Sequence, residues 1–248
     1  MRIKIGLKSV PGTIIPIEYN YALYLGLRRL LFQYLKVSKP KTATQYKRRL
    51  PDFTYSQLQI PQRRAEPGML HIDSPYFSLY LSSDDDQFLK HTFAAVQAGG
   101  RLSFFSHSFP LAGVEVLEDP EISASELRGR MISPLLLARH LDKKVQFLTP
   151  HSPDLNAAFT SDLLGRFAAT RGGMPASREV SFDLDQGYLA RAKSSTRLIT
   201  VRGTHFRLIW APFTLRADPE VLRFAYRAGL GERRAYGFGM FELLDHTR

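Results

Sequence analysis

The chain contains no cysteine among its 248 residues, which excludes disulfides, zinc–thiolate sites, iron–sulfur clusters and thiol nucleophiles. It also lacks any run approaching the ~18 consecutive apolar residues of a membrane span. Residues 1–8 are charged and alternate in polarity, without the apolar stretch of a signal peptide. We therefore expect a cytoplasmic protein that contacts no membrane.

Acidic residues are few: 23 Asp and Glu stand against 34 Lys and Arg, which gives a formal net charge of +11. The excess lies in residues 28–64 and 190–236, and the remainder of the chain is acidic. This distribution is typical of a protein with one phosphate-binding face and one ordinary face. Two solvated surfaces rich in lysine and arginine would have the same composition, so charge alone leaves both interpretations open.

Hydrophobic periodicity predicts two successive units in which strands and helices alternate as βαββαβ. This order is typical of an α+β fold, a tandem ferredoxin-like (RRM-like) arrangement with antiparallel sheets and domains at 1–120 and 121–248. The expected helices span 19–34, 84–98 (capped by Ser82 or Ser83), 153–169 and 218–228, and 36–50 is expected to be a loop or short broken helix. The expected strands span 2–8, 53–60, 68–73, 76–81, 101–107, 113–117, 130–139, 144–149, 178–185, 196–202, 205–210, 212–216 and 236–244.

The most informative segment is residues 229–239, with the sequence GLGERRAYGFG. Glycine permits positive φ and close approach of a backbone, and paired arginines can fork onto phosphates. The segment is not a Walker loop, because no Gly-Lys-Ser/Thr follows. It is not a dinucleotide-binding fingerprint either, because its glycines precede a strand instead of opening a helix. The structural alternative is a helix C-cap at Gly229 followed by a glycine-rich strand start.

This segment resembles the C-terminal signature of the CRISPR repeat-processing endoribonucleases, the sixth Cas family within the RAMP superfamily. Residues 15–21 resemble that family's entry into the first helix, 53–56 its Phe-Thr-Phe-Ser strand, and 132–134 the opening of its second half. The resemblance implies a protein that binds CRISPR repeat RNA and cleaves it without a metal or other cofactor. In the implied reaction the 2′-hydroxyl attacks the adjacent phosphate and leaves 2′,3′-cyclic phosphate and 5′-hydroxyl ends.

The sequence departs from the family at the general base. Many relatives place a histidine between the first helix and the Phe-Thr-Phe-Ser strand, but none of the seven histidines here precedes His71. Tyr21 and Tyr46 are the candidates for proton handling and Lys47 for electrostatic support, with core packing and general phosphate attraction as their structural alternatives. A tyrosine or lysine titrates about three units above neutrality, so its basic form costs about 4 kcal/mol. We expect slow cleavage, or a RAMP subunit that holds guide RNA without cutting it.

RNA contact is predicted for the basic and small polar residues of the stretch 191–207 and for the glycine-rich segment. Tyr236 and Phe238 could stack on bases, although Phe238 is equally suited to the core. His71 and His107 are expected to be structural, His151 to cap a helix and His91 to lie at the surface, whereas His205 is expected to contact RNA. The residues expected to bind RNA are Arg28, Arg29, Lys39, Arg48, Arg191, Lys193, Arg197, Arg202, His205, Arg207, Gly229, Gly231, Arg233, Arg234, Gly237 and Gly239.

Two other classes of function were weighed. The concentrated basic segments argue against a pair of ferredoxin-like domains that bind a metabolite, and no helix-turn-helix or zinc-finger pattern supports a DNA-binding protein. The expected partners are CRISPR repeat RNA or crRNA, with other Cas effector subunits as further candidates. The expected assembly is a monomer or a homodimer.

Overall fold

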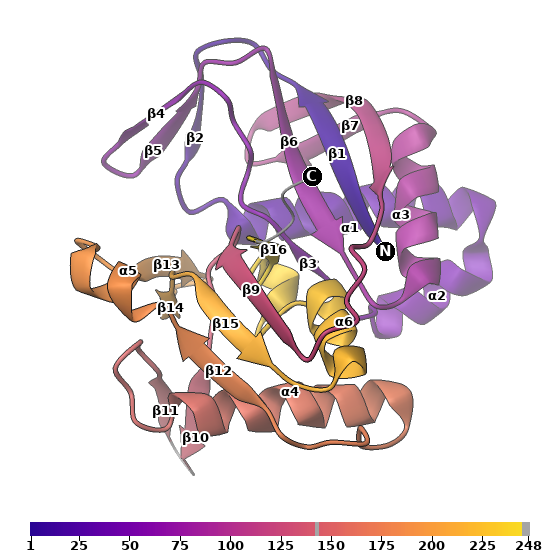
Figure 1. The fold of residues 1–248 in the computed structure, drawn as a ribbon. Coiled ribbons are helices and arrows are strands. Elements are labelled where there is room, and N and C mark those ends of the chain that lie inside the picture. Colours follow the sequence, from indigo (N-terminus) through magenta and orange to yellow (C-terminus); the bar gives the residue numbers. More distant parts are fainter. Residues whose placement is uncertain (142–143, 245–248) are drawn as a thin grey trace. The chain divides into compact units, whose positions relative to one another are not determined.

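The computed structural model describes residues 1–141 and 144–244. The chain forms two compact units, Met1–Asp119 and Pro120–Arg248, each of which packs helices against an antiparallel sheet (Figure 1). This arrangement matches the predicted α+β class. Within the described ranges, no helix combines the length and the apolar character needed to cross a membrane.

The N-terminal unit is built on a five-stranded sheet in the order β3-β6-β1-β8-β7. Along β1, Ile3, Ile5 and Leu7 are fully buried, as the alternating pattern predicts. Helices α1 and α3 pack on this sheet, and a smaller sheet has the order β2-β5-β4. The bounds are β1 Arg2–Lys8, β2 Thr13–Pro16, α1 Asn20–Ser38, α2 Pro40–Arg48, β3 Thr54–Tyr55, β4 Arg63–Glu66, β5 Met69–Ile72, β6 Tyr76–Ser82, α3 Asp86–Gln97, β7 Arg101–Phe104 and β8 His107–Leu117.

Helix α2 confirms the short broken helix, rather than the loop, of the two expectations for 36–50. Lys39 separates it from α1, and Pro40 opens it, where the missing N–H and fixed φ of proline suit a helix start. Ala43 and Tyr46, three residues apart, are its buried positions, so one face packs inward while the basic residues remain outside.

The start of α3 differs from the prediction. Its N-cap is Asp85, whose carboxylate accepts the Phe88 N–H at 2.9 Å, whereas Ser83 only accepts the Asp85 N–H at 3.1 Å. His91 lies three residues after Phe88 on the buried face of the helix. The prediction that His91 lies at the surface is therefore wrong.

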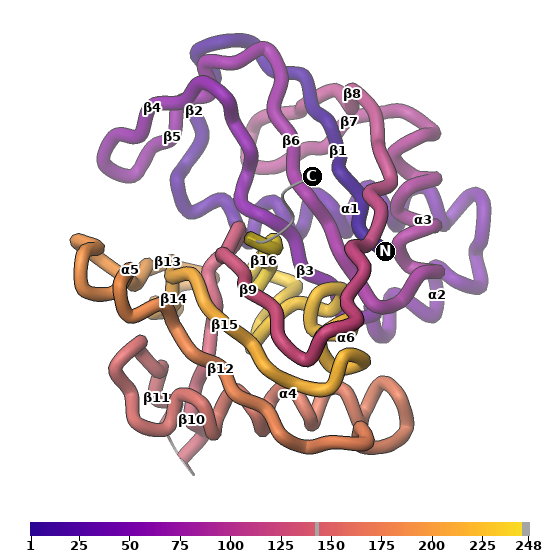
Figure 2. Tube along the Cα trace, viewed as in Figure 1, coloured from indigo at the N-terminus to yellow at the C-terminus, as the bar shows by residue number. Residues whose placement is uncertain are grey.

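The C-terminal unit is built on a four-stranded sheet in the order β12-β15-β9-β16. Aromatic and aliphatic side chains of this sheet and of helices α4 and α6 form a large core. Two hairpins, β10–β11 and β13–β14, complete it, and Figure 2 follows the chain through both. The bounds are β9 Glu126–Met131, β10 Ala138–Leu141, β11 Lys144–Phe147, α4 Leu155–Arg171, β12 Ser181–Leu184, α5 Gln186–Arg191, β13 Thr196–Val201, β14 Thr204–Ile209, β15 Phe213–Arg216, α6 Pro219–Ala228 and β16 Phe241–Leu243.

Two predictions for this unit are wrong. The strand expected at 130–139 is interrupted, because the Ile132 and Ser133 N–H groups donate to the Met240 carbonyl at 2.9 and 3.0 Å instead of continuing a ladder. The strand expected at 236–244 shrinks to β16, preceded by a short 3-10 turn at Arg234–Tyr236. Helix α5 was not predicted, because the expected strands end at 185 and resume at 196.

Candidate nucleic-acid interface

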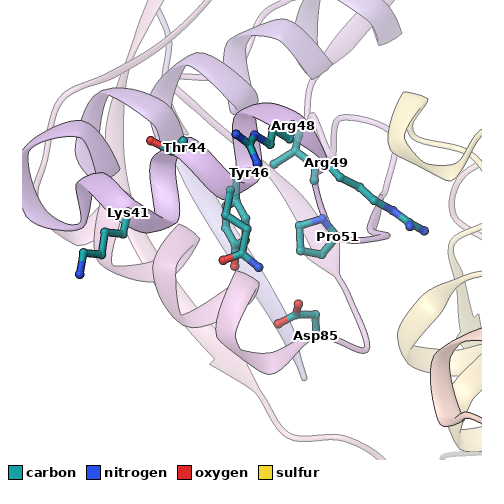
Figure 3. A pocket seen from close by; sticks show the side chains of 9 residues that line it. Lys41, Thr44, Tyr46, Arg48, Arg49, Pro51 and Asp85 are labelled. Carbon is teal, nitrogen blue, oxygen red and sulfur yellow. The ribbon is translucent and has the colours of Figure 1, made fainter.

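A pocket of about 560 Å³ opens beside α2 in the N-terminal unit (Figure 3). Of the predicted site residues, Tyr46 and Arg48 line it, whereas Lys47 is exposed on the same helix outside its lining. Lys41 and Arg49 point to opposite sides in Figure 3, so the cations surround the opening rather than converge on one point. The pocket is lined by Lys41, Thr44, Gln45, Tyr46, Arg48, Arg49, Leu50, Pro51 and Asp85, and is called here the α2 pocket.

Tyr46 joins α2 to α3. Its side chain is only 5% exposed, its ring meets that of His91 edge-on with centroids 5.9 Å apart, and its hydroxyl lies 3.3 Å from His91 Nδ1. Burial, assisted by the charge of Asp85, raises the pKa of Tyr46 to about 12. The phenolate is then scarcer than the phenol by about 100,000-fold at pH 7, or about 7 kcal/mol. At pH 7, Tyr46 alone is therefore a poorer base than a tyrosine with the ordinary pKa near 10.

His91 is the titratable residue that sequence reasoning placed wrongly. Burial and the positive charge of Lys39 lower the pKa of His91, and the carboxylate of Asp85 opposes them. The neutral imidazole is therefore favoured near pH 7. The helical spacing of Phe88 and His91 could have indicated burial, but the contact with Tyr46, 45 residues away in sequence, has no local signal.

Of the remaining predicted residues of the N-terminal unit, Lys39 is exposed between α1 and α2, and the others lie on α1. Tyr21 is half-buried and stacks on Tyr24, with ring centroids 6.0 Å apart, and it does not line the α2 pocket. The Arg28 guanidinium lies over the Phe32 ring, 5.3 Å from its centroid, while Arg29 is exposed. Tyr21 and Tyr46 are thus not gathered into one catalytic group around this pocket.

The glycine-rich segment is folded into the C-terminal unit. A Cβ on Gly231 would lie 2.2 Å from the Leu136 carbonyl oxygen, and one on Gly239 would lie 1.8 Å from that of Leu230. Both have positive φ, as do Gly229 and Gly237. Gly231 and Gly239 are needed where the chain approaches its own backbone, so the fold explains these two without a ligand.

The two arginines of this segment have different environments. Arg234 is buried and donates a hydrogen bond from Nη1 to the Gly231 carbonyl, so the prediction that it forks onto a phosphate is wrong. Arg233 is exposed and has a left-handed backbone, with φ of 52°. Phe238 is fully buried and belongs to the core, whereas Tyr236 is half-buried.

The β13–β14 hairpin presents an exposed basic face. His205 pairs with Thr200 across the strands and their side chains lie 2.9 Å apart, while Arg207 pairs with Leu198, which is 66% exposed. These pairs lie on one face, because neighbouring cross-strand pairs two residues apart point the same way. The exposed basic residues of the hairpin, on either face, and of the segment before it are called here the hairpin surface: Arg191, Lys193, Arg197, Arg202, His205 and Arg207.

Arg202 and Gly203 form the two-residue turn of this hairpin, with φ of 53° and 78°. Positive φ at both positions is the type I′ geometry, which favours Asn-Gly and makes arginine an unusual first residue. Arg197 lies on the opposite face from Arg207, with its guanidinium 5.6 Å from the Trp210 ring centroid.

His140, which no prediction included, contacts the glycine-rich segment. Its Nε2 lies 3.0 Å from a carboxylate oxygen of Glu232, beside a pocket of about 500 Å³. His246 lies outside the described residues. Among the residues that are described, no group of three or more histidines and carboxylates is placed to hold a metal ion.

Residues 117–243, just over half of the chain, match the family model described as CRISPR associated protein Cas6, C-terminal. The chain belongs to the Cas6 family. It is 22% identical to the CRISPR-associated endoribonuclease-like protein Cas6nc of Pyrococcus horikoshii, over 99% of this chain and 100% of that protein. It is 25% identical to the CRISPR-associated endoribonuclease Cas6 1 of Methanocaldococcus jannaschii, over 97% of this chain and 91% of that one.

A solved structure described as a RAMP protein binding different RNA substrates superposes with a TM-score of 0.83 at 22% identity, covering 99% of this chain and 100% of that chain. This likeness confirms the tandem ferredoxin-like fold. The family match confirms the resemblance that the glycine-rich segment indicated.

Proposed function

We propose that this Cas6-family protein binds CRISPR repeat RNA and cleaves it slowly, without a metal, by attack of a 2′-hydroxyl on the adjacent phosphate. The observation that carries the proposal is the hairpin surface. Within the described residues, Arg191, Lys193 and Arg207 form no ion pair, so their charges remain available to phosphates. The Methanocaldococcus relative is named as a CRISPR-associated endoribonuclease, which supports repeat RNA as the substrate class.

The chemistry needs a base for the 2′-hydroxyl, a proton for the 5′-oxygen that leaves, and cations near the phosphorane. The α2 pocket offers Arg48 as a cation and Tyr46 as a hydroxyl, and exposed Lys47 adds charge on the same helix. The products would be 2′,3′-cyclic phosphate and 5′-hydroxyl ends. Slow turnover follows from the high pKa of Tyr46, about 12, because the phenolate is scarce.

A second candidate is a guide-RNA holder that does not cut. The burial of Tyr46 favours this candidate. Only 5% of the residue is exposed, so an RNA ribose has little access to it as a base. Such a protein would remain with crRNA, and other Cas effector subunits would be its further partners. A monomer and a homodimer suit either candidate.

Purified protein with labelled repeat RNA in EDTA distinguishes the candidates, using a matched RNA with 2′-deoxyribose at the cleavage position. Cleavage of the ribose RNA alone, with a 2′,3′-cyclic phosphate end, supports the nuclease. Tight binding of both RNAs without product supports the holder. If neither RNA binds above a scrambled RNA of equal length, the proposed function is wrong.

A further inference from the structure

An imidazole on α3 lies behind a residue that lines the α2 pocket. The region between α1 and β3 contains no histidine, but Tyr46 lines the pocket and its hydroxyl also lies 3.3 Å from His91 Nδ1. His91 itself is 9% exposed and does not line the pocket. Tyr46 is therefore the group that connects this imidazole with anything bound in the pocket.

The surroundings of His91 suit a neutral acceptor. The titratable groups that act on it are Lys39 at the start of α2, Asp85 at the start of α3, and Tyr46. Burial and Lys39 lower the pKa of His91. For Tyr46 to donate to Nδ1, the imidazole must carry its own proton on Nε2.

We propose that His91 is a positioning residue of the α2 pocket, which holds the Tyr46 hydroxyl and accepts its proton when Tyr46 takes the proton of an RNA 2′-hydroxyl. This inference rests on the proposed cleavage function.

The step balances without a further reactant. The 2′-oxygen forms a bond to phosphorus while its proton moves to Tyr46 Oη, and the phenol proton moves to His91 Nδ1. The bond from phosphorus to the 5′-oxygen breaks, and that oxygen takes a proton from water. The proton on His91 then returns to solvent. No free phenolate is formed, because Tyr46 gains one proton as it loses the other.

The competing explanation is packing alone. The Tyr46 ring also lies against Phe88, with centroids 6.1 Å apart, so the contact of α2 with α3 could serve stability only. Packing predicts that a substitution lowers the melting temperature and changes RNA cleavage at all pH values equally. A proton-accepting role predicts a change in the pH dependence of cleavage.

His91→Asn separates the two explanations, since the asparagine carbonyl can accept the Tyr46 hydrogen bond but cannot take up a proton. Tyr46→Phe removes the hydroxyl. His71→Asn is the matched control: His71 is in the same unit, its side chain is 12% exposed, and its partner Glu66 lies 3.3 Å away on the small sheet. Single-turnover cleavage in EDTA, affinity for the 2′-deoxy RNA and melting temperature are measured for each protein.

We expect His91→Asn and Tyr46→Phe to slow cleavage about 100-fold while affinity stays within about threefold, and His71→Asn to behave as wild type. The wild-type rate should rise with pH through a value below 6.5, the ordinary pKa of histidine, and then level off. His91→Asn should lose this rise.

Three results overturn the inference in distinguishable ways. If His91→Asn cleaves within about threefold of wild type, or is slow with an unchanged pH profile, His91 only packs and the nuclease proposal stands. If wild-type protein binds repeat RNA without cutting it, the proposed proton transfer from Tyr46 to His91 and the proposed cleavage are both wrong, and the proposed RNA binding is supported. If wild-type protein does not bind repeat RNA, the proposed function falls too.

Discussion

If Arg202 binds RNA as proposed, folding and RNA binding make opposite demands on it. Its φ of 53° suits asparagine better than arginine in a type I′ turn. We expect Arg202→Asn to raise the free energy of unfolding by about 0.5 kcal/mol, since the strain of the left-handed arginine is relieved. Affinity for repeat RNA should nevertheless fall, and the slope of log K against log salt should become shallower by about 0.7 for one lost phosphate contact.

Arg178→Asn is the control for this prediction, because Arg178 is an exposed arginine outside the hairpin surface. It removes the same charge without changing a turn. Denaturant unfolding and a salt titration of binding measure both effects. If Arg202→Asn strengthens RNA binding, or if the control weakens it equally, Arg202 makes no specific contact.

Gly239 tests whether the glycine-rich segment is required by its own fold. A Cβ there would lie 1.8 Å from the Leu230 carbonyl oxygen, so Gly239→Ala should lower the free energy of unfolding by more than about 3 kcal/mol. Gly172, at the C-terminus of α4, has a similar φ of +78° but nothing within 4 Å of its Cβ position. Gly172→Ala should cost only about 1 kcal/mol. Equal losses in the two variants would contradict the steric explanation.

The environment of a residue was predictable from the sequence only where neighbouring residues in the chain determine it. Arg197 and Arg207 are exposed on strands that the sequence predicted, and their contact with RNA stays a prediction. The burial of Arg234 depends on how the segment closes on Gly231, which no spacing reveals. The Tyr46–His91 contact likewise arises from packing of two helices that are far apart in the chain.

The link between α2 and α3 makes stability depend on pH in a defined direction. Burial and Lys39 hold the pKa of folded His91 below 6.5, so the unfolded chain binds its proton more readily. The contribution of His91 to stability is therefore present above pH 6.5 and is lost as pH falls through the folded pKa. Denaturant unfolding should show a smaller loss of stability from pH 7 to 5 for His91→Asn than for wild type. An equal or larger loss would show that His91 is not the group responsible.

At the scale of elements, helices with strong end signals were the most predictable. Asp218-Pro219 opens α6, and the Asp218 carboxylate accepts the Glu220 N–H at 2.8 Å, as a cap predicts. The strand expected at 130–139 was not predictable, because the Ser133 hydroxyl accepts the Met240 N–H at 2.8 Å and fixes a turn-like path. A partner 107 residues away in sequence overrides an apolar run that locally favours a strand.

At the scale of the whole molecule, the net charge of +11 is divided between two basic regions, one in each unit. Whether a single RNA uses both can be tested by removing three charges at a time. One variant replaces Arg197, Arg202 and Arg207 by glutamine, and the other replaces Lys41, Arg48 and Arg49. We expect wild-type binding of single-stranded repeat RNA to show a slope of log K against log salt of about −3.5 for about five phosphates.

Each triple variant should make that slope shallower by about 0.7 for every phosphate contact that it removes, and the two reductions together should not exceed about 3.5. If the two sets act independently on the RNA, the two losses in binding free energy should add in the variant that carries all six substitutions. An unchanged slope for the α2 variant would confine RNA binding to the hairpin surface and remove the α2 pocket from the interface. An unchanged slope for the hairpin variant would contradict the observation on which the proposed function depends, since ordinary solvated arginines release no counterions when RNA binds elsewhere.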